Sequence, residues 1–593
     1  MRCAAIAFAF IVGGLLVGAP LAVMVTQSLR ADLVETEDAR YVGQETDGDA
    51  SYRTDDGKVV RGVTIRVHGE TDVRFIPREA ILREARIFSF VHYKGVLTGA
   101  GERNMLLATV ALAGASTLLA LLLGLPFGLL LGATDLPGRR VLETASVLPL
   151  VLPPVLLAIA TYHDLLVVKP EFLRAVIVFG LCLFPLVSLL VARAIRATGA
   201  DALDAALVQV PPRTALLRVA LGPALPGAAM GSLLAFAFVV SDFAVPDFLG
   251  VTTAQNTITV YANAVFSRWN NAGDAGAATA AGMPATALAL AAFAAVLWVE
   301  RRRAASTVQG DFRPPDPLPL GRARRPLLVA ALLLLGLSLL WPAYRHLETA
   351  SGAHYGDPVA SGGANPQVKV EARTKPKSLA DGLRKGLNHP GIGKSALLSI
   401  KLAGAGALLA LLAALLLVEA GRMAPRLDKV LLILCFLPVA APPMSFAVGY
   451  VKLWGPSTWE YYPVVLLAAR LLPFAAFAVR TARLRLAPEL LEAGAVAGLS
   501  GPRRHFRITL PLLAPAMGLG FLLAFLFGLR EVDALVFTKS GSATMPVQLY
   551  NMIHFGYDVQ VGGLSFLWMT AVGLLLLLLA LLIPHKGTGR RRR

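Results

Sequence analysis

The sequence contains few charged residues and few cysteines. Asp, Glu, Lys and Arg together make up 16% of the 593 residues, whereas soluble globular proteins have about 25%. This low charge, combined with a hydrophobic fraction of 56%, argues against a soluble enzyme and against a disordered chain. The three cysteines, Cys3, Cys182 and Cys435, lie in apolar segments without metal-ligand spacing, which supports neither a disulfide framework nor a zinc site.

Long apolar runs take up most of the chain. A helix needs about 20 apolar residues to cross the hydrocarbon core of a bilayer. The runs are continuously apolar and do not alternate, so they predict spanning helices and not a β-barrel. We therefore expect an all-α polytopic membrane protein with about twelve transmembrane helices. The expected spans are residues 4–25, 105–132, 145–162, 172–192, 228–249, 277–299, 326–343, 395–419, 430–451, 461–479, 514–530 and 564–584.

Basic residues are concentrated in alternate loops. The net charge is +18, and in a membrane protein such an excess indicates cytoplasmic loops rather than nucleic-acid binding. The basic loops include 301–303, 480–507 and the tail 590–593, whereas the short loops between them carry few basic residues. Both termini are therefore predicted to be cytoplasmic, and no nucleic-acid partner is expected. The first apolar run, which follows Arg2, also resembles a cleavable signal peptide.

Two longer polar segments interrupt the spans on the predicted outer side. In residues 30–103, Val63, Ile65 and Val67 alternate with polar residues, a pattern typical of a strand with one buried face. This segment predicts a small external β or α/β insert. Residues 346–393 are rich in Gly, Pro and Lys and predict a loop with little fixed structure.

The two halves of the chain resemble each other. Leu-Ala-Gly-Ala occurs at 112–115 and at 402–405, and a Leu-Pro segment that ends in Pro-Pro occurs at 148–154 and at 437–443. The offsets within these two pairs are 290 and 289 residues, which indicates a duplication. Each half has six expected spans, so both halves enter the membrane from the same side and form two parallel six-helix repeats.

Each half has a proline pair inside an expected span. Pro153-Pro154 and Pro442-Pro443 each interrupt a helix and free backbone carbonyls. Such breaks are tolerated where neighbouring helices or a water-filled cavity satisfy the backbone. Two interpretations stay open at this point: the prolines line a transport pathway, or they are packing kinks away from it.

A cytoplasmic loop of the second half carries a more specific motif. Residues 487–511 contain Glu492-Ala493-Gly494, then Gly498, and end in Ile-Thr-Leu-Pro. This pattern resembles the EAA loop of binding-protein-dependent ABC transporter permeases, in which Glu-Ala-Ala is followed by Gly and by Ile-x-Leu-Pro. Gly498 is suited to end a helix, because glycine readily adopts the left-handed conformation found at helix C-termini.

The first half carries a degenerate copy of the same loop. Asp204-Ala205-Ala206 stands at the corresponding place, with Val210 where the family has glycine. The resemblance implies that both loops form helix-turn-helix elements that dock on two cytoplasmic ABC ATPase subunits. The coupling residues that it implies are Asp204, Ala205, Ala206, Glu492, Ala493, Gly494 and Gly498.

The resemblance also implies the function and the partners. The fold would be that of a type I ABC importer permease in the bacterial inner (plasma) membrane, which receives its cargo from an external solute-binding protein. ATP would be hydrolysed by the partner subunits, so this chain is not expected to be an enzyme or to hold a cofactor. Two permease domains fused in one chain resemble most closely the iron(III)-type importers. The thiamine, phosphonate, polyamine and sulfate permeases share much of the pattern.

These expectations give a domain organisation along the chain. The predicted order is a first transmembrane helix (1–29), an external insert (30–103), a first permease domain (104–300) with a coupling loop (195–226), a cytoplasmic linker (301–325), a transmembrane helix (326–345), an external loop (346–393), a second permease domain (394–585) with a coupling loop (481–513) and a basic cytoplasmic tail (586–593).

Two carboxylates fall in or next to expected spans. Asp242 and Glu531 occupy corresponding positions when counted from Pro226 and Pro515. A carboxylate inside a membrane usually faces protein or water, so both are pathway candidates for cargo contact or gating. The alternative is a hydrogen bond between helices or exposure at the membrane interface.

Two other functional classes can be weighed against the sequence. Residues 391–395 read Gly-Ile-Gly-Lys-Ser, but the phosphate-binding loop needs an earlier glycine where Asn388 stands, so no nucleotide site is expected. No catalytic or metal site is indicated by residue spacing. A secondary transporter of the major-facilitator organisation also has twelve spans in two parallel halves, and it stays open as an alternative.

Overall fold

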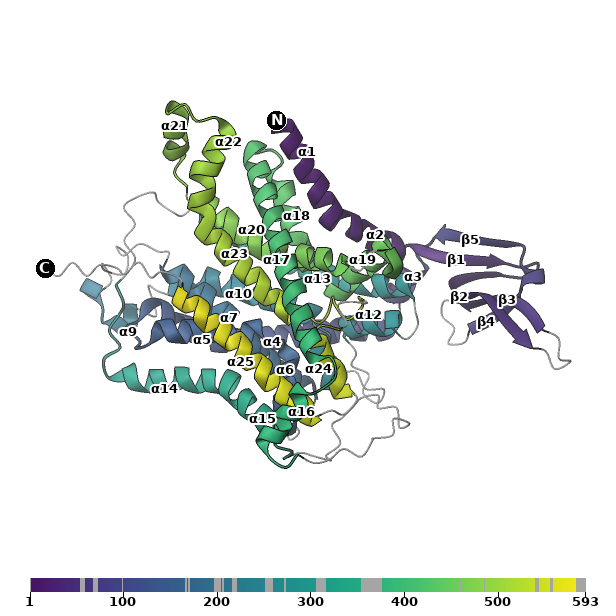
Figure 1. Cartoon of the computed structure of the whole chain (residues 1–593), viewed down its shortest axis with the longest axis horizontal. Helices are drawn as coiled ribbons and strands as arrows, with labels where there is room; N and C mark the ends of the chain where they lie inside the picture. The colour runs from purple at the N-terminus through teal and green to yellow at the C-terminus, as the bar shows by residue number, and fades with distance from the viewer. Residues whose placement is uncertain are drawn as a thin grey trace.

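The computed structural model is mostly helical, with a small sheet at one end (Figure 1). It describes residues 2–53, 59–67, 73–98, 100–165, 168, 171–196, 204, 207–215, 221–250, 260–270, 274–304, 316–353, 376–458, 461–484, 486–538, 543–554 and 558–582. Ten helices of the described part are long and apolar enough to cross a membrane, or up to twelve if each of two bent helix pairs counts as one span. The expected class, an all-α polytopic membrane protein with a small insert, is confirmed.

The N-terminal segment forms one apolar helix with a local π-turn. It consists of α1 (Arg2–Gly13), η1 (Gly14–Gly18) and α2 (Ala19–Ser28). A matching helix begins the second half of the chain. It consists of η4 (Gly321–Ala323), α14 (Arg324–Leu335), a second π-turn η5 (Gly336–Leu340) and α15 (Trp341–Ala350). The two helices thus share the same irregularity, although their sequences differ.

The remaining helices fall into two series with the same order. The first series is α3 (Val91–Thr98), α4 (Ala100–Ala133), α5 (Arg139–Val151), α6 (Pro154–Leu165), α7 (Glu171–Arg196), α9 (Pro212–Ala215), α10 (Leu221–Ser241), α11 (Ala244–Phe248), α12 (Tyr261–Asn270) and α13 (Ala275–Ala304). The second series is α16 (Leu379–Leu387), α17 (Ile392–Met423), α18 (Asp428–Ala440), α19 (Pro443–Thr458), α20 (Tyr462–Leu484), α21 (Pro488–Val496), α22 (Gly501–Arg504), η6 (His505–Thr509), α23 (Leu510–Arg530), α24 (Met545–His554) and α25 (Asp558–Leu582).

The insert after the first helix is a five-stranded antiparallel sheet. Its strands are β1 (Arg30–Glu35), β2 (Arg40–Arg53), β3 (Val59–Val67), β4 (Val73–Pro77) and β5 (Arg83–Phe88), with η2 (Arg78–Ala80) before the last strand. The order across the sheet is β4-β3-β2-β1-β5, and Val63 pairs with Ile76 in the register of β3 and β4. Val34, Val63, Ile65 and Ile76 form its small core, so the alternation seen in the sequence marks a strand as predicted.

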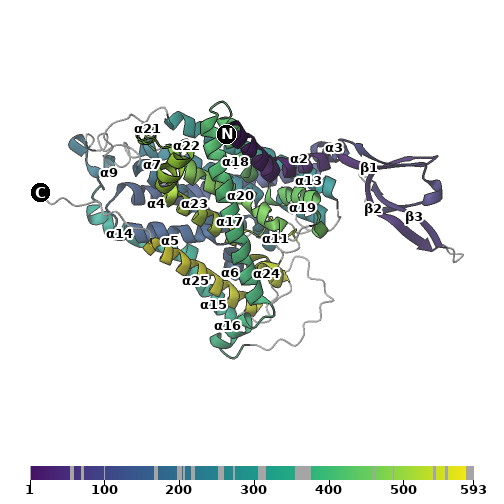
Figure 2. The same ribbon diagram turned by 45° about the horizontal axis from the view of Figure 1, so that its top comes forward.

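The first helix of each half packs across the other half. α2 contacts α19 of the second half as well as α13, and α15 contacts α6 of the first half as well as α25. Two hydrogen bonds support these contacts between the halves. Tyr450 donates its hydroxyl hydrogen to the carbonyl of Leu16, and His346 Nε2 lies 3.1 Å from the carbonyl oxygen of Leu156. Figure 2 shows α2 beside α19, next to the sheet. The two halves are therefore interlocked.

Within each helix series, an arginine–carboxylate pair joins two corresponding helices. The Arg196 guanidinium forms two hydrogen bonds of 2.9 and 2.8 Å to Glu143, and Arg480 forms two bonds of 2.8 and 2.9 Å to Asp428. The first pair ties α7 to α5, and the second ties α20 to α18. Corresponding helices are thus joined in both halves, but Arg480 and Asp428 lie 284 and 285 residues after Arg196 and Glu143, about one helical turn away from the positions that the 289-residue offset aligns.

Two of the expected spans are bent in the structure at their proline pairs. The helix axes of α5 and α6 differ by 87° at Pro153-Pro154, and those of α18 and α19 differ by 103° at Pro442-Pro443. Proline removes a backbone donor and clashes with the preceding turn, so two successive prolines end one helix and begin another. Residues 145–162 and 430–451 are therefore broken spans or re-entrant segments, with the interruption at each proline pair that the sequence predicts.

The segment expected to be a loop at 346–393 contains regular structure. α15 continues to Ala350, α16 packs on α25, and α17 begins at Ile392. Glycine allows this close packing: a Cβ on Gly386 would lie 3.2 Å from Leu564 Cγ. Residues 354–375 of this predicted loop lie outside the described residues, whereas Gly382 and Gly386 serve contact between helices.

Candidate transport pathway and coupling loop

The second loop of the chain folds into two short helices joined by a tight turn. α21 begins at Pro488, which suits the first helical position because its missing N–H would be unpaired there anyway. Gly498 follows α21 with φ +77°, and its N–H donates to the Ala495 carbonyl at 3.0 Å. The Leu499 N–H donates to the Gly494 carbonyl at 3.0 Å, which completes a Schellman motif. The expectation that Gly498 ends this helix agrees with the geometry.

The two short helices pack tightly on each other. Gly494 is buried, and a Cβ added there would lie only 2.5 Å from Ile508 Cδ1. Arg504 Nη1 donates to the Leu491 carbonyl at 3.2 Å, which ties α22 to α21. The small size of Gly494 thus gives room to Ile508 of the same loop.

The outer face of α21 is open. Glu492 and Ala493 are exposed, and Val496 keeps 90% of its surface accessible. Leu490 and Phe506 add apolar surface that is 49% and 66% exposed. In Figure 1, α21 and α22 lie at the upper left of the molecule and the sheet lies at the far right. The loop therefore offers a rigid, partly apolar surface at the end of the molecule away from the sheet.

The corresponding loop of the first half is built differently. Asp204 is partly buried, and Ala205 and Ala206 lie outside the described residues. Val210 packs with Leu318 in a small apolar cluster that also contains Leu207 and Ala215. Leu318 is itself pinned to the end of α4, because its N–H donates to the Ala133 carbonyl at 2.8 Å. The first loop is thus attached to the linker between the halves.

A cleft lies between the two halves near the two helix bends. It contains about 740 Å³ of space between atoms, including space open to solvent. Five of the six predicted pathway residues line it, and Pro442 is buried beside it without lining it. The five are Pro153, Pro154, Asp242, Pro443 and Glu531.

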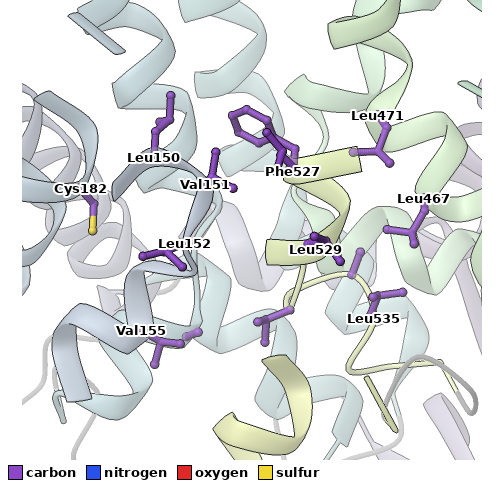
Figure 3. Close-up of a cluster of buried hydrophobic side chains, with 14 of the residues drawn as sticks. Leu150, Val151, Leu152, Val155, Cys182, Leu467, Leu471, Phe527, Leu529 and Leu535 are labelled. Carbon is purple, nitrogen blue, oxygen red and sulfur yellow. The ribbon is translucent and has the colours of Figure 1, made fainter. Parts of the chain in front are cut away.

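Apolar side chains of both halves meet around this cleft. Leu150, Val151 and Val155 come from the bent pair α5–α6, and Leu471 and Phe527 come from α20 and α23 (Figure 3). All five are buried. Because the walls come from different halves, a relative movement of the halves would change the width of the cleft.

The two predicted carboxylates cap equivalent turns. Asp242 Oδ1 accepts the Val245 N–H at 3.1 Å, and Glu531 Oε1 accepts the Ala534 N–H at 3.1 Å. Each carboxylate follows a long helix, α10 or α23, and stabilises the turn after it. The local hydrogen bond explains why both halves keep an acidic residue here, and the cleft-lining position leaves a pathway role open as well.

Two arginines of the cleft satisfy the carbonyls that the bends leave free. Arg470 Nη1 donates to the carbonyls of Pro438 and Ala441 at 2.8 and 3.2 Å, and its Nη2 lies 3.8 Å from Glu531 Oε2. Arg530 donates from Nη1 to the Leu150 carbonyl beside the other bend. Both arginines belong to the second half, so one half supplies the cationic groups for both bends.

Sequence reasoning missed three charged residues of the cleft. Arg470, Arg530 and Asp533 line it, and none of them is among the six predicted pathway residues. Arg470 carried a usable signal, because it stands inside an otherwise apolar expected span at 461–479. A charged residue inside a membrane span is by default a candidate functional residue.

Comparison with known proteins identifies the family. A family model described as "Binding-protein-dependent transport system inner membrane component" matches residues 124–305 and 406–591, together more than half of the chain. It matches once in each half, in agreement with the duplication and with the two predicted permease domains.

Two curated relatives are similar to part of this chain. The molybdenum transport system permease proteins ModB of Mycobacterium bovis and Mycobacterium tuberculosis are each 34% identical to it over 163 residues. The matched part covers 25% of this chain, and the chain spans 62% of the length of these relatives. Neither comparison supports the iron(III)-type subgroup suggested by the sequence. The chain belongs to the family of binding-protein-dependent transport system inner membrane components, as a transport component with two permease domains and not as an enzyme.

Proposed function

We propose that this chain supplies both permease domains of an ATP-driven ABC importer in a bacterial inner membrane. Both termini face the cytoplasm, and an external binding protein delivers the cargo on the side of the sheet. Two ABC ATPase subunits dock on the loops at 195–226 and 481–513, with Glu492, Ala493 and Gly498 in the second docking surface. The observation that carries the proposal is the rigid, exposed α21 element at the end of the molecule away from the sheet (Figure 1).

A direct mechanical connection between this loop and the cleft supports the proposal. Residues 501–530 form one continuous helical stretch that starts in the loop and ends at the cleft. Thirty helical residues span about 45 Å at 1.5 Å per residue. Gly494 packs on Ile508 within that stretch, so a movement of α21 is passed to it.

Alternating access follows from this connection. ATP binding closes the ATPase dimer and pulls the two loops together, which shifts α23 relative to the bent pair α5–α6 of the other half. Since the cleft walls come from both halves, this shift opens the cleft toward one side of the membrane and closes it toward the other. ATP hydrolysis and product release reset the cycle.

For the cargo, we propose a small inorganic ion. Two candidates rest on different observations. The fused two-domain arrangement resembles iron(III) importers, whereas the partial similarity to ModB favours molybdate. Thiamine, phosphonate, polyamine and sulfate importers have the same general organisation and provide the comparison substrates. Uptake of radiolabelled iron(III) and molybdate by cells that express the intact operon separates the two, and uptake of neither rejects the proposed class of cargo.

The coupling proposal is tested in the reconstituted complex with its ATPase and binding protein. We expect the double variant Glu492→Lys, Gly498→Pro to lower ATPase stimulation by the loaded binding protein by about tenfold or more, since a lost charged contact and a broken turn act together. ATPase activity is also measured without the binding protein, and the matched control for that measurement is Glu84→Lys, the same charge reversal on an exposed residue of strand β5.

Three results would contradict the coupling proposal. The first is full stimulation in the double variant, and the second is an equal loss of ATPase activity without the binding protein in the Glu84→Lys control. The third is uptake that continues after ATP depletion but stops with an uncoupler, which would favour a secondary transporter of the major-facilitator organisation.

A further inference from the structure

Arg530 joins the two halves at the cleft. It is the last residue of α23 in the second half, and its Nη1 donates to the Leu150 carbonyl of the first half. Its guanidinium carbon lies 5.4 Å from the ring centroid of Phe238 in α10 and 5.4 Å from that of Phe527 in α23. Both distances are within the range for cation–π attraction. A single side chain thus contacts the carbonyl of one helix bend and an aromatic ring from each half.

The aromatic rings around Arg530 form a continuous stack across the interface. Phe238 and Phe527 stack with ring centroids 6.1 Å apart, and Phe527 stacks on Phe474 at 4.1 Å. Phe238, Phe474 and Phe527 all line the cleft together with Arg530. The arginine therefore closes a contact that includes both walls of the cleft.

The first half has no equivalent charge at this place. At the offset that aligns Asp242 with Glu531, Arg530 aligns with Ser241, whose hydroxyl donates to the Ala237 carbonyl of its own helix at 2.8 Å. Arg470, the other arginine of the cleft, donates to Pro438 and Ala441 and pairs with Glu531, all within the second half. Among the contacts described for Ser241, Arg470 and Arg530, only those of Arg530 cross between the halves.

We propose that Arg530 is the positioning residue that holds the two halves closed at the cleft, and that opening of the pathway requires its release from Leu150 and Phe238. A guanidinium suits this function, because its planar donors bind a carbonyl while its face packs on aromatic rings. Arg530 also ends the helical stretch that begins in the coupling loop, so movement of that loop pulls directly on this contact. This last step rests on the proposed function, whereas the closing contact itself does not.

The test measures opening of the cleft in the purified full-length chain in lipid nanodiscs, without ATPase or binding protein. A cysteine replaces Ala244, a buried residue that lines the cleft, in a variant whose exposed Cys3 is changed to serine and whose buried Cys182 and Cys435 are changed to alanine. The probe is a membrane-impermeant methanethiosulfonate reagent. A second cysteine variant, Ala289→Cys, reports on a fully buried position in α13 that does not line the cleft.

We expect Arg530→Ala to speed modification of Cys at 244 by roughly tenfold or more, because a charge-assisted hydrogen bond and two cation–π contacts are lost together. Arg530→Lys keeps the charge without the planar donor set and is expected to give an intermediate rate. Ser241→Ala, at the corresponding position of the first half, is expected to leave the rate unchanged.

Two outcomes would overturn the proposal. An unchanged rate at 244 in Arg530→Ala would show that the contact does not keep the cleft closed. An equal increase at 244 and 289 would show general loosening of the fold. If the rate at 244 rises as expected but the coupling-loop variants leave ATPase stimulation unchanged, the closing contact stands and the proposed coupling fails.

Discussion

The two halves of this molecule share a scaffold but differ in their charged residues. In both halves, an arginine that forms two hydrogen bonds to a carboxylate ties a bent helix pair to a long helix. In both halves, a carboxylate also caps the turn that follows α10 or α23. At the cleft, the four residues 241–244 read Ser-Asp-Phe-Ala, whereas 530–533 read Arg-Glu-Val-Asp. The carboxylate that caps the turn stands at the same aligned position in both copies, whereas the charges at the pathway are concentrated in the second.

The same difference appears at the ends of the helices next to the coupling loops. Arg483 Nε donates to Glu419 Oε1 at 2.9 Å, and both side chains are about nine-tenths buried. At the offset of 290 residues that aligns Thr109 with Ser399, Glu419 aligns with Leu129. The second half therefore has a buried ion pair between α17 and α20 where the first half has an apolar side chain on α4.

Removal of one partner of that pair should have the largest effect. Glu419→Ala leaves the Arg483 guanidinium buried without its carboxylate, which is expected to cost about 3–5 kcal/mol. The double variant Glu419→Leu, Arg483→Leu makes the position resemble the first half and is expected to be near neutral, because apolar replacements of similar volume avoid the cost of burying charge. Denaturant unfolding of the purified chain in detergent measures both. Equal loss of stability in the single and double variants would show that the pair itself stabilises the second half.

Much of this architecture can be predicted from the sequence, because it depends on patterns that repeat along one chain. Hydropathy gives the long spans, alternation at Val63 and Ile65 gives a strand, and the paired prolines give the helix breaks. The direction of each bend cannot be obtained in this way. It depends on which group satisfies the freed carbonyls, and those groups, Arg470 and Arg530, come from helices distant in sequence.

The coupling loop shows the same limit. The motif identifies Glu492, Ala493, Gly494 and Gly498, but one pattern cannot separate residues that face a partner from those that face the loop itself. Gly494 belongs to the second kind, because Ile508 occupies the space next to it. Residue type predicts that a close approach occurs, and only packing shows which surface approaches.

A substitution at the turn of the second loop compares that turn with the one in the first loop, and its expected effect on stability is intermediate in size. Gly498→Ala is expected to destabilise the α21–α22 turn by about 1–2 kcal/mol, because an L-residue is strained at φ +77°. In the described residues, positive φ angles occur only at glycines, so Val210 does not adopt this conformation in the first loop. Val210→Ala should therefore have no comparable effect on its own turn.

Hydrogen exchange of backbone amides in 488–504 and 207–215 measures the two turns separately. Faster exchange in the second loop of Gly498→Ala, with the first loop of Val210→Ala unchanged, is the expected result. Equal protection of the second loop with Gly and with Ala at 498 would mean that the Schellman turn does not depend on glycine.

The smallest effects are expected where the halves are most alike. Thr109 Oγ1 accepts the Tyr261 N–H at 3.2 Å, and Ser399 Oγ accepts the Met545 N–H at 2.7 Å; each thus ties the start of a short helix, α12 or α24, to a long one. Each hydroxyl also donates to the carbonyl four residues earlier, Met105 or Ser395, at 2.8 Å. Thr109→Val and Ser399→Ala should each cost about 1 kcal/mol, the usual net value of one hydrogen bond.

The two losses should also add, because the sites share no partners in the described structure and distant sites behave independently. Denaturant unfolding of the two single variants and of the double variant provides the measurement. Similar single costs that sum in the double variant would support a scaffold that both halves still share. A cost in one half several times that in the other would mean that the divergence seen at the cleft extends into the contacts that hold the helices together.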